Sequence, residues 1–225
     1  VKDTFSRTVA DNWGQADTGH DWDHSWFSGG SVNDFDVAGG VGTHSVGAAN
    51  SGRVTFLADE NYRDIDVAVS VTFPYVDVAG GAVGSGIIVR GGPDEEYFAD
   101  VWVGPAETVF VRLWIYDGAY TALTSSVQVT DFVYTGQQLR MRALIAGDQF
   151  LFKVWPAAGT EPYGWHIEAV PFTAPSAGWI GIQSDIYTSN TNTKPGVFAY
   201  DNLVVRSPRF AGEVAAWPQR WATRL

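Results

Sequence analysis

Residues 86–116 concentrate side chains that bind polar ligands: arginine, aspartate, tryptophan and tyrosine. The segment reads GIIVRGGPDEEYFADVWVGPAETVFVRLWIY, and its turn-forming residues divide it into three predicted strands at 86–90, 97–103 and 109–116. Because successive side chains of a strand point to opposite faces, one face is aliphatic. The other face carries Arg90, Asp100, Trp102, Arg112, Trp114 and Tyr116. A solvated face usually carries threonine, serine and lysine instead, so this face is the candidate working surface.

A second group with possible chemistry is His20-Asp21-Trp22-Asp23-His24, because imidazole and carboxylate are both metal ligands. In an extended strand, however, the two histidines share one face and the two aspartates the other. The four groups then converge only in a tight loop. We therefore expect a solvated loop here rather than a metal site.

The elements that position these residues are strands. Residues 64–75 alternate cleanly between aliphatic and polar side chains, further strands are predicted at 120–129, 165–172, 178–187 and 197–205, and a hairpin is predicted at 137–155. No window has a convincing helical period, and no repeat of propeller-blade length occurs. The sequence predicts an all-β, two-sheet antiparallel sandwich. Its expected core includes Val69, Val89, Val101, Leu113 and Met141, and we also expect Phe5, Trp13, Trp22 and Trp26 to be buried.

Composition narrows the function classes. The 225 residues carry a formal charge of -11, which opposes binding to nucleic acid or to an anionic membrane surface. The absence of cysteine excludes disulfides and zinc-thiolate sites. No apolar run reaches the roughly 20 residues that span a bilayer, and the first residues do not resemble a signal peptide. We expect a soluble chain without membrane insertion, and these features leave open whether it is a fragment of a longer protein.

Three segments carry a resemblance to a known family. DTFSRTVADNWGQADTG, GSGIIVRGGPDEEYFADVW and VFAYDNLVV resemble the concanavalin A-like or laminin-G-like jelly roll of secreted actinobacterial proteins and of minor tail proteins of actinobacteriophages. The similarity spans residues 3–206. Residues 210–221 resemble the GEV-x-x-WP-x-RW segment of such tail proteins. The resemblance implies a jelly-roll domain at 1–207, a linker or following module at 208–225, and a place in the virion tail or outside the cell with other tail proteins as partners.

The resemblance also implies carbohydrate binding on the concave sheet or its rim. Aromatic rings stack on the apolar C–H face of a pyranose, while arginine and aspartate bond its hydroxyl groups. The residues with suitable chemistry and parity are Arg90, Asp100, Trp102, Arg112, Trp114, Tyr116, Gln183 and Asp185. The expected ligand is a bacterial surface or cell-wall glycan. In the alternative interpretation, a loop covers the tryptophans, the charged residues form a buried salt-bridge network, and the domain is a structural spacer.

Catalysis is a further alternative. Retaining glucanases of this fold carry an E-x-D-x-x-E or E-x-D-x-E strand, which places two carboxyl groups on one face. No such string occurs here, and Glu95 and Glu96 fall in a predicted turn. Nor does the chain contain a G-x-S-x-G, Walker or H-E-x-x-H motif. We therefore expect a non-catalytic domain, with a divergent glycoside hydrolase as the second alternative.

The resemblance finally implies a structural calcium ion. The final strand of the family often carries an aspartate that holds calcium together with backbone carbonyls, and Asp201 matches that position, with Asp3 and the turn at Gly39 as neighbours. Alternatively, Asp201 accepts hydrogen bonds from backbone amides of the opening segment without an ion.

Overall fold

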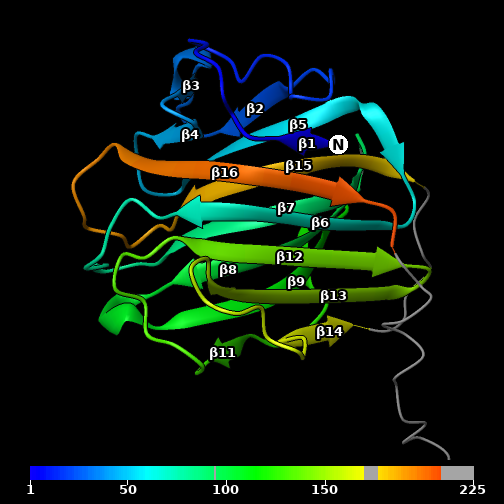
Figure 1. Cartoon of the computed structure of the whole chain (residues 1–225). Helices are drawn as coiled ribbons and strands as arrows, with labels where there is room; N and C mark the ends of the chain where they lie inside the picture. Colours follow the sequence, from blue (N-terminus) through cyan, green and yellow to red (C-terminus); the bar gives the residue numbers. More distant parts are fainter. Residues whose placement is uncertain (94, 170–176, 209–225) are drawn as a thin grey trace, which may run out of the picture.

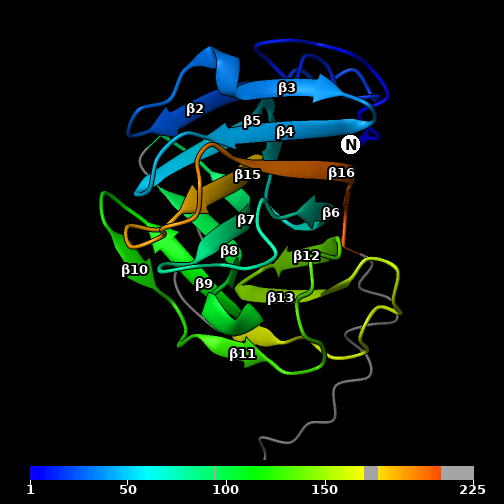
Figure 2. The ribbon, with the colours of Figure 1, turned by 90° about the vertical axis from the view of Figure 1, so that its left-hand side faces the viewer.

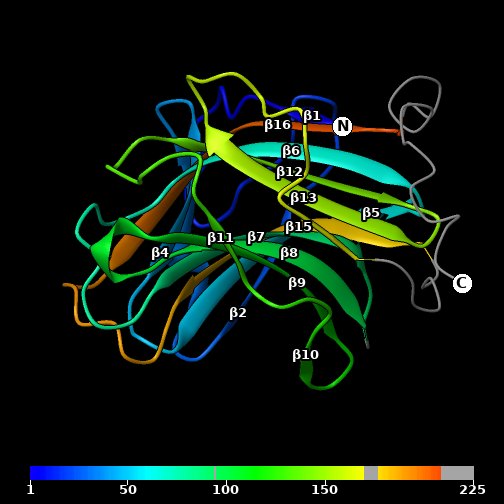
Figure 3. The same ribbon diagram turned by 90° about the horizontal axis from the view of Figure 1, so that it is seen from below.

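Two antiparallel sheets stacked face to face form the protein, as its computed structural model shows for residues 1–93, 95–169 and 177–208 (Figures 1 and 3). Sheet 1 has the order β14-β13-β12-β6-β16-β4-β3, with β1 paired to β16; sheet 2 has the order β10-β9-β8-β7-β15-β5-β2, with β11 paired to β9. Sheet 1 consists of β1 (Lys2–Asp3), β3 (Phe35–Ala38), β4 (Val41–Val46), β6 (Ile65–Thr72), β12 (Leu139–Ala146), β13 (Gln149–Pro156), β14 (Ile167–Ala169) and β16 (Gly196–Arg206). Sheet 2 consists of β2 (Asp23–Phe27), β5 (Ser51–Tyr62), β7 (Val83–Gly91), β8 (Glu96–Val103), β9 (Val109–Tyr116), β10 (Tyr120–Ala122), β11 (Val127–Val129) and β15 (Gly178–Ile186). The jelly-roll sandwich predicted from the sequence is confirmed.

The core lies between the sheets and follows from strand alternation. Val69, Val89, Val101, Leu113 and Met141 are all fully buried, as predicted. A slip of one residue in any of these strands would turn its aliphatic set outward, so burial of that set fixes the register. The rows of sheet 2 from β2 to β9 can be followed in Figure 2.

Some predicted details are wrong. Residues 120–129 form two short strands that both pair with β9, rather than one continuous strand. Trp26 is 41% exposed, because β2 lies at the edge of sheet 2 and four of its five residues are exposed, whereas Phe5, Trp13 and Trp22 are buried. The helical segments of the described residues are single turns, Val32–Asp34 and Pro105–Glu107, and none is long and apolar enough to cross a membrane.

Candidate functional site

The outer face of sheet 2 brings most of the predicted site residues together. In the β8–β9 ladder, Asp100 lies opposite Arg112, and Trp102 lies opposite Phe110. Phe98 lies opposite Trp114, and Glu96 opposite Tyr116, in the same ladder. Because these positions share one parity on paired strands, their side chains form one continuous surface. We call this surface the aromatic-carboxyl face.

Arg112 organises the aromatic side chains of this face. Its guanidinium carbon lies 3.8 Å from the ring centroid of Trp114 and 4.9 Å from that of Trp102. Trp102 stacks in turn on Phe110, and Trp114 stacks on Phe98. The two tryptophans are half-buried. They form neither the exposed cluster expected of a glycan-binding face nor the covered cluster expected of a structural spacer. Arg112 holds the two indoles apart and leaves part of each open to solvent.

Glycines form the floor between β8 and β15. Gly84 lies between Asp185 and Trp102, and Gly86 lies between Gln183 and Asp100. Without side chains on β7 at these two positions, the flanking residues can reach across the strand. Tyr187 does so, because a Cβ at Gly84 would lie 3.0 Å from its ring and its hydroxyl lies 3.4 Å from Asp100 Oδ2.

Three carboxyl groups of this face have strongly shifted pKa values. Burial raises the pKa of Glu96, of Asp100 and of Asp185 to about 7 each. Among the described residues, Asp100 Oδ1 and Asp185 Oδ1 are buried and have no hydrogen-bond partner. A buried polar atom without a partner is costly, so each oxygen is available to a ligand hydroxyl group.

The surroundings distinguish the two aspartates. Arg112, Trp114 and Tyr187 act on Asp100 to favour its ionised form against the effect of burial on its pKa. Gln183 Nε2 donates to Asp185 Oδ2 at 2.8 Å and favours the ionised form of Asp185. The nearby charge of Asp100 has the opposite effect and raises the pKa of Asp185 further. Both carboxyl groups therefore have pKa values near neutral pH, and a charge on Asp100 disfavours a second charge on Asp185.

A buried polar network beneath β15 positions Gln183 and Asp185. Tyr200 of sheet 1 lies with its hydroxyl 2.8 Å from Ser85 Oγ and 2.5 Å from Ser184 Oγ, and it donates to the Gln183 carbonyl at 3.2 Å. His44 Nδ1 lies 2.8 Å from Ser184 Oγ. Burial lowers the pKa of His44 well below its usual value, so the imidazole is neutral. The network ties β15 and its neighbour β7 to sheet 1.

Arg90 does not belong to the site, contrary to the prediction. Its backbone has a φ of 50°, at a register shift between β15 and β7, and strand parity fails there. Its guanidinium instead bonds the Arg63 carbonyl at 2.5 Å, Asp64 at 3.2 Å and the Gly147 carbonyl at 2.9 Å. Arg90 therefore ties the turns of the two sheets together.

Glu96, Tyr120 and Tyr187 are site residues that the sequence reasoning missed. Glu96 begins β8 rather than lying in a turn, and it shares the face of Asp100 because the two are four positions apart. Extending the strand predicted at 97–103 by one residue would have placed Glu96 on this face from the sequence alone. Tyr120 comes from β10 and packs against Tyr116, Trp114 and Phe98, which no local pattern signals.

The residues predicted to hold calcium do not fit the ion as a set. The carboxylate of Asp3 accepts from Arg7 through both oxygens at 2.7 and 2.9 Å, from the Phe5 amide at 2.9 Å and from Trp22 Nε1 at 2.8 Å. Four donors leave no lone pair of Asp3 for a cation, so its assignment as a calcium ligand is wrong.

The remaining members of that predicted set, Asp201 and Gly39, have separate environments. Asp201 Oδ2 accepts from Asn202 Nδ2 at 2.7 Å, and no described amide of the opening segment donates to it. Gly39 lies in the turn between β3 and β4 with a φ of 62°. The opening segment is tied to β16 by other bonds: the Val1 ammonium donates to the Val205 carbonyl at 3.1 Å, and the Val205 amide donates to the Val1 carbonyl at 2.8 Å.

No protein-family profile and no curated protein sequence matches the chain. Solved structures do match. SCLam, a non-specific endo-β-1,3(4)-glucanase of family GH16, is 12% identical with a TM-score of 0.61, and the match covers 92% of this chain and 90% of that one. Bacillus licheniformis β-glucanase is 12% identical with a TM-score of 0.60, covering 93% and 98%. The VIP36 exoplasmic/lumenal domain, in its Ca²⁺/Man3GlcNAc-bound form, is 7% identical with a TM-score of 0.55, covering 84% of each chain.

These matches establish a concanavalin A-like jelly roll, a fold that carbohydrate-binding and carbohydrate-cleaving proteins share. They correct the expectation of a non-catalytic domain, since several of the matching structures are β-glucanases. That expectation rested on the absence of an E-x-D-x-x-E or E-x-D-x-E motif, which would place the catalytic carboxyl groups on one strand. The carboxyl groups of this face come instead from β8 and β15. The matches give no support to a phage tail origin.

Proposed function

We propose that this domain is a divergent glycoside hydrolase-like domain, which binds a β-linked glucan on the aromatic-carboxyl face and cleaves it there. The observation that carries the proposal is the pair Asp100 and Asp185. Both are buried carboxyl groups with pKa values raised to about 7, and each has one oxygen without a partner among the described residues.

Hydrolysis of a glycosidic bond needs one protonated and one ionised carboxyl group. The environments described above assign these states. Asp185, beside the charge of Asp100, is the general acid that protonates the leaving oxygen. Asp100, stabilised by Arg112 and Tyr187, is the carboxylate that acts as nucleophile or base at the anomeric carbon. Environments that separate the protonation states of two carboxyl groups are a recurring basis of acid–base assignment.

The aromatic side chains provide the sugar-binding part of the proposal. The open parts of Trp102 and Trp114 flank Arg112, and Tyr116 and Tyr120 continue the row at a ring-centroid distance of 4.9 Å. Such a row suits the apolar faces of successive pyranose rings, while Gln183 and Arg112 offer hydrogen bonds to hydroxyl groups. An extended polysaccharide fits a sheet face of this kind better than a single monosaccharide.

The test is hydrolysis of mixed-linkage β-1,3(4)-glucan and of laminarin, measured as new reducing ends, together with calorimetric binding. Wild type is expected to cleave at least one of them. Asp100→Asn and Asp185→Asn should each lower kcat by about 100-fold or more, since a positioned acid or base contributes on the order of 10²–10⁴. Binding should persist in both variants because the amide keeps the shape of the carboxyl group.

Two control variants make the test specific. Asp201→Asn removes a carboxyl group of sheet 1 and should leave the rate unchanged. Glu96→Gln tests whether Glu96, the third carboxyl group of the face, supplies the proton in place of Asp185. A large rate loss in Glu96→Gln together with normal activity in Asp185→Asn would overturn the assignment. Wild type that neither binds nor cleaves any β-glucan would overturn the proposed function itself.

The setting of the domain is a separate proposal. We infer from residues 210–221, which lie outside the described residues, that it belongs to a minor tail protein of an actinobacteriophage and acts outside the host cell on its surface glycan. Peptides of this chain in purified virions would support that setting, and their absence from virions that contain the other tail proteins would contradict it.

A further inference from the structure

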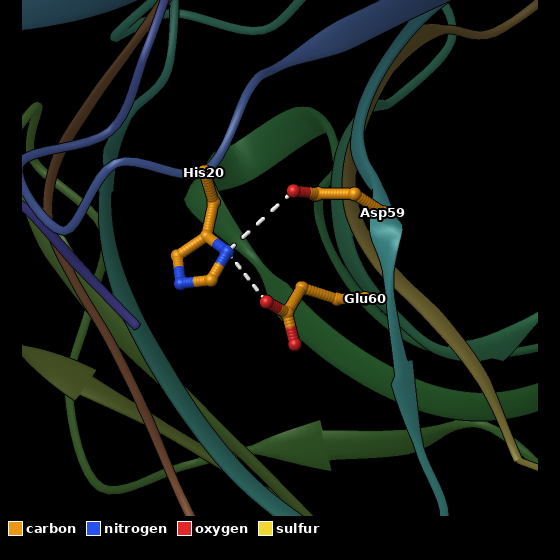
Figure 4. Close-up of side chains that lie close together, drawn as sticks. All are labelled: His20, Asp59 and Glu60. Atoms are coloured by element: carbon orange, nitrogen blue, oxygen red, sulfur yellow. Dashed lines mark ion pairs between the residues drawn. The ribbon is translucent and has the colours of Figure 1, made fainter.

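A histidine and two carboxylates from distant parts of the chain meet at one end of the β2–β5 ladder. His20 Nδ1 lies 2.5 Å from Glu60 Oε1 and 3.7 Å from Asp59 Oδ2. Figure 4 shows both carboxylates turned toward the same ring nitrogen. The ligand atoms of the three residues all lie within 4.8 Å of one another. The cluster involves neither Asp100 nor Asp185.

The fold places these residues together in two ways. In the ladder of β2 and β5, Asp23 lies opposite Phe56 and His24 opposite Thr55, so continuing this register brings position 20 opposite position 59. The register of β5 with β15 shifts between Gly178 and Ile180. Such an irregularity lets adjacent residues escape strict alternation, so Asp59 and Glu60 both face the histidine.

Both sides of the cluster are held in place. A small hairpin fixes His20, whose carbonyl accepts from the Ala16 amide at 2.8 Å, with Gln15 paired to Asp21 beside it. Glu60 lies on β5, and Tyr62, two positions further along that strand, is paired with Gly178 of β15. In metal sites, surrounding contacts of this kind hold each ligand in the orientation needed to bind the ion.

We propose that His20, Asp59 and Glu60 form a binding site for a divalent transition-metal ion of the Zn²⁺ type. One imidazole nitrogen and two carboxylate oxygens are three ligands of the kind zinc takes, and water completes the tetrahedron. Calcium and magnesium prefer ligand sets made only of oxygen atoms, so a site that contains an imidazole nitrogen should bind them more weakly than zinc. A metal ion binds His20 only through an unprotonated Nδ1, so a proton on that nitrogen leaves to solvent when the ion binds. The side-chain exposures are 30% for His20, 19% for Glu60 and 55% for Asp59, so an ion can reach the cluster from solvent.

From the sequence, a metal site was considered for a different set, His20 with Asp21, Asp23 and His24, and a solvated loop was expected there instead. The structure divides that set. His24 stacks against Trp26 and Phe35, and Asp21 accepts from Gln15 at 3.1 Å. The partners of His20 instead lie some 40 positions later in the chain, at Asp59 and Glu60, which no local motif could reveal.

The experiment is isothermal titration of the whole, EDTA-treated chain with Zn²⁺, and in parallel with Mg²⁺ and Ca²⁺, followed by thermal melts. We expect one equivalent of Zn²⁺ bound and a melting temperature that rises with free Zn²⁺, since the ion binds only the native site. His20→Ala and Glu60→Gln should each weaken binding by at least about tenfold. Asp21→Asn removes the same charge next to His20 but no ligand, and should bind as wild type does.

No saturable Zn²⁺ binding by the wild type would overturn the proposal. Equal Zn²⁺ affinity in wild type and His20→Ala would overturn it too, because the ion would then occupy other residues. A stronger response to Ca²⁺ than to Zn²⁺ would show that the imidazole is not a ligand.

Discussion

At the scale of single residues, the state of Asp185 links the site to the stability of the fold. Its carboxyl group loses its proton near pH 3.8 when exposed and near pH 7 when buried in the native protein. Between these values the native state binds the extra proton, so raising the pH from 4 to 7 lowers the free energy of unfolding. The loss is at most about 1.4 kcal/mol per pH unit for each such group, and it ends above pH 7, where both states are ionised.

Asp185→Asn should therefore flatten the fall in unfolding free energy between pH 4 and pH 7, and the variant should gain stability relative to wild type as the pH rises. Urea unfolding at pH 5 and pH 7 measures the difference. Asp201→Asn, with its carboxyl group on the other sheet, serves as the control for removing one negative charge. An unchanged pH dependence in Asp185→Asn would mean that Asp185 is not buried as described.

Residue by residue, the sequence could place side chains only where strands are regular. Parity correctly put Asp100, Arg112 and Trp114 on one face, because β8 and β9 pair without interruption. It failed for Arg90, where a left-handed backbone and a register shift turn the side chain away. The roles of Asp100 and Asp185 could not be assigned from sequence either, since their pKa values depend on burial and on each other.

At the scale of elements, the polar network around Tyr200 decides how firmly β15 is held. The Tyr200 hydroxyl contacts Ser85, Ser184 and the Gln183 carbonyl inside the core. Tyr200→Phe leaves these groups without that partner, and an unsatisfied buried group costs about 1–3 kcal/mol. We expect a loss of stability of that order in urea unfolding, and a weaker affinity for glucan because Gln183 and Asp185 lose their support.

Tyr163→Phe is the matched control, because Tyr163 is 96% exposed and should tolerate the same change. Equal stability of the two variants would contradict a supporting role for the network.

The sequence predicted neither the network nor its partners. Tyr200, Ser184 and His44 sit on three strands of two different sheets, and only stacking of the sheets brings them together. Alternation within each strand, in contrast, was sufficient to predict the sandwich.

At the scale of the whole molecule, charge is distributed unevenly between the two outer faces. The chain carries a net charge of -11, yet cations gather on the outer face of sheet 1. There Arg142 pairs with Asp66 at 2.7 Å and with Glu161 at 2.6 Å, and Lys153 also pairs with Glu161 at 2.7 Å. Arg140 and Arg206 line the same shallow pocket. The aromatic-carboxyl face of sheet 2, in contrast, has Arg112 among three carboxyl groups.

This distribution predicts how ionic strength affects glycan binding. A neutral glucan on the aromatic-carboxyl face has no charge for the acidic protein to repel, so its affinity should change less than about twofold between 0.01 M and 0.15 M salt. A polysaccharide with carboxyl groups is repelled by the net charge. Its binding should be weaker than that of the neutral glucan and should strengthen as the Debye length falls from about 30 Å to about 8 Å.

Calorimetry with laminarin and with polygalacturonate at the two salt concentrations measures this difference, and carboxyl-reduced polygalacturonate is the control for backbone chemistry. If polygalacturonate instead binds more tightly at low salt, then the cations around Arg140 and Arg206 attract it, and binding has moved to the outer face of sheet 1. Trp114→Ala distinguishes the two locations. It weakens laminarin binding only if the glucan lies on the aromatic-carboxyl face, since Trp114 does not line the cationic pocket of sheet 1.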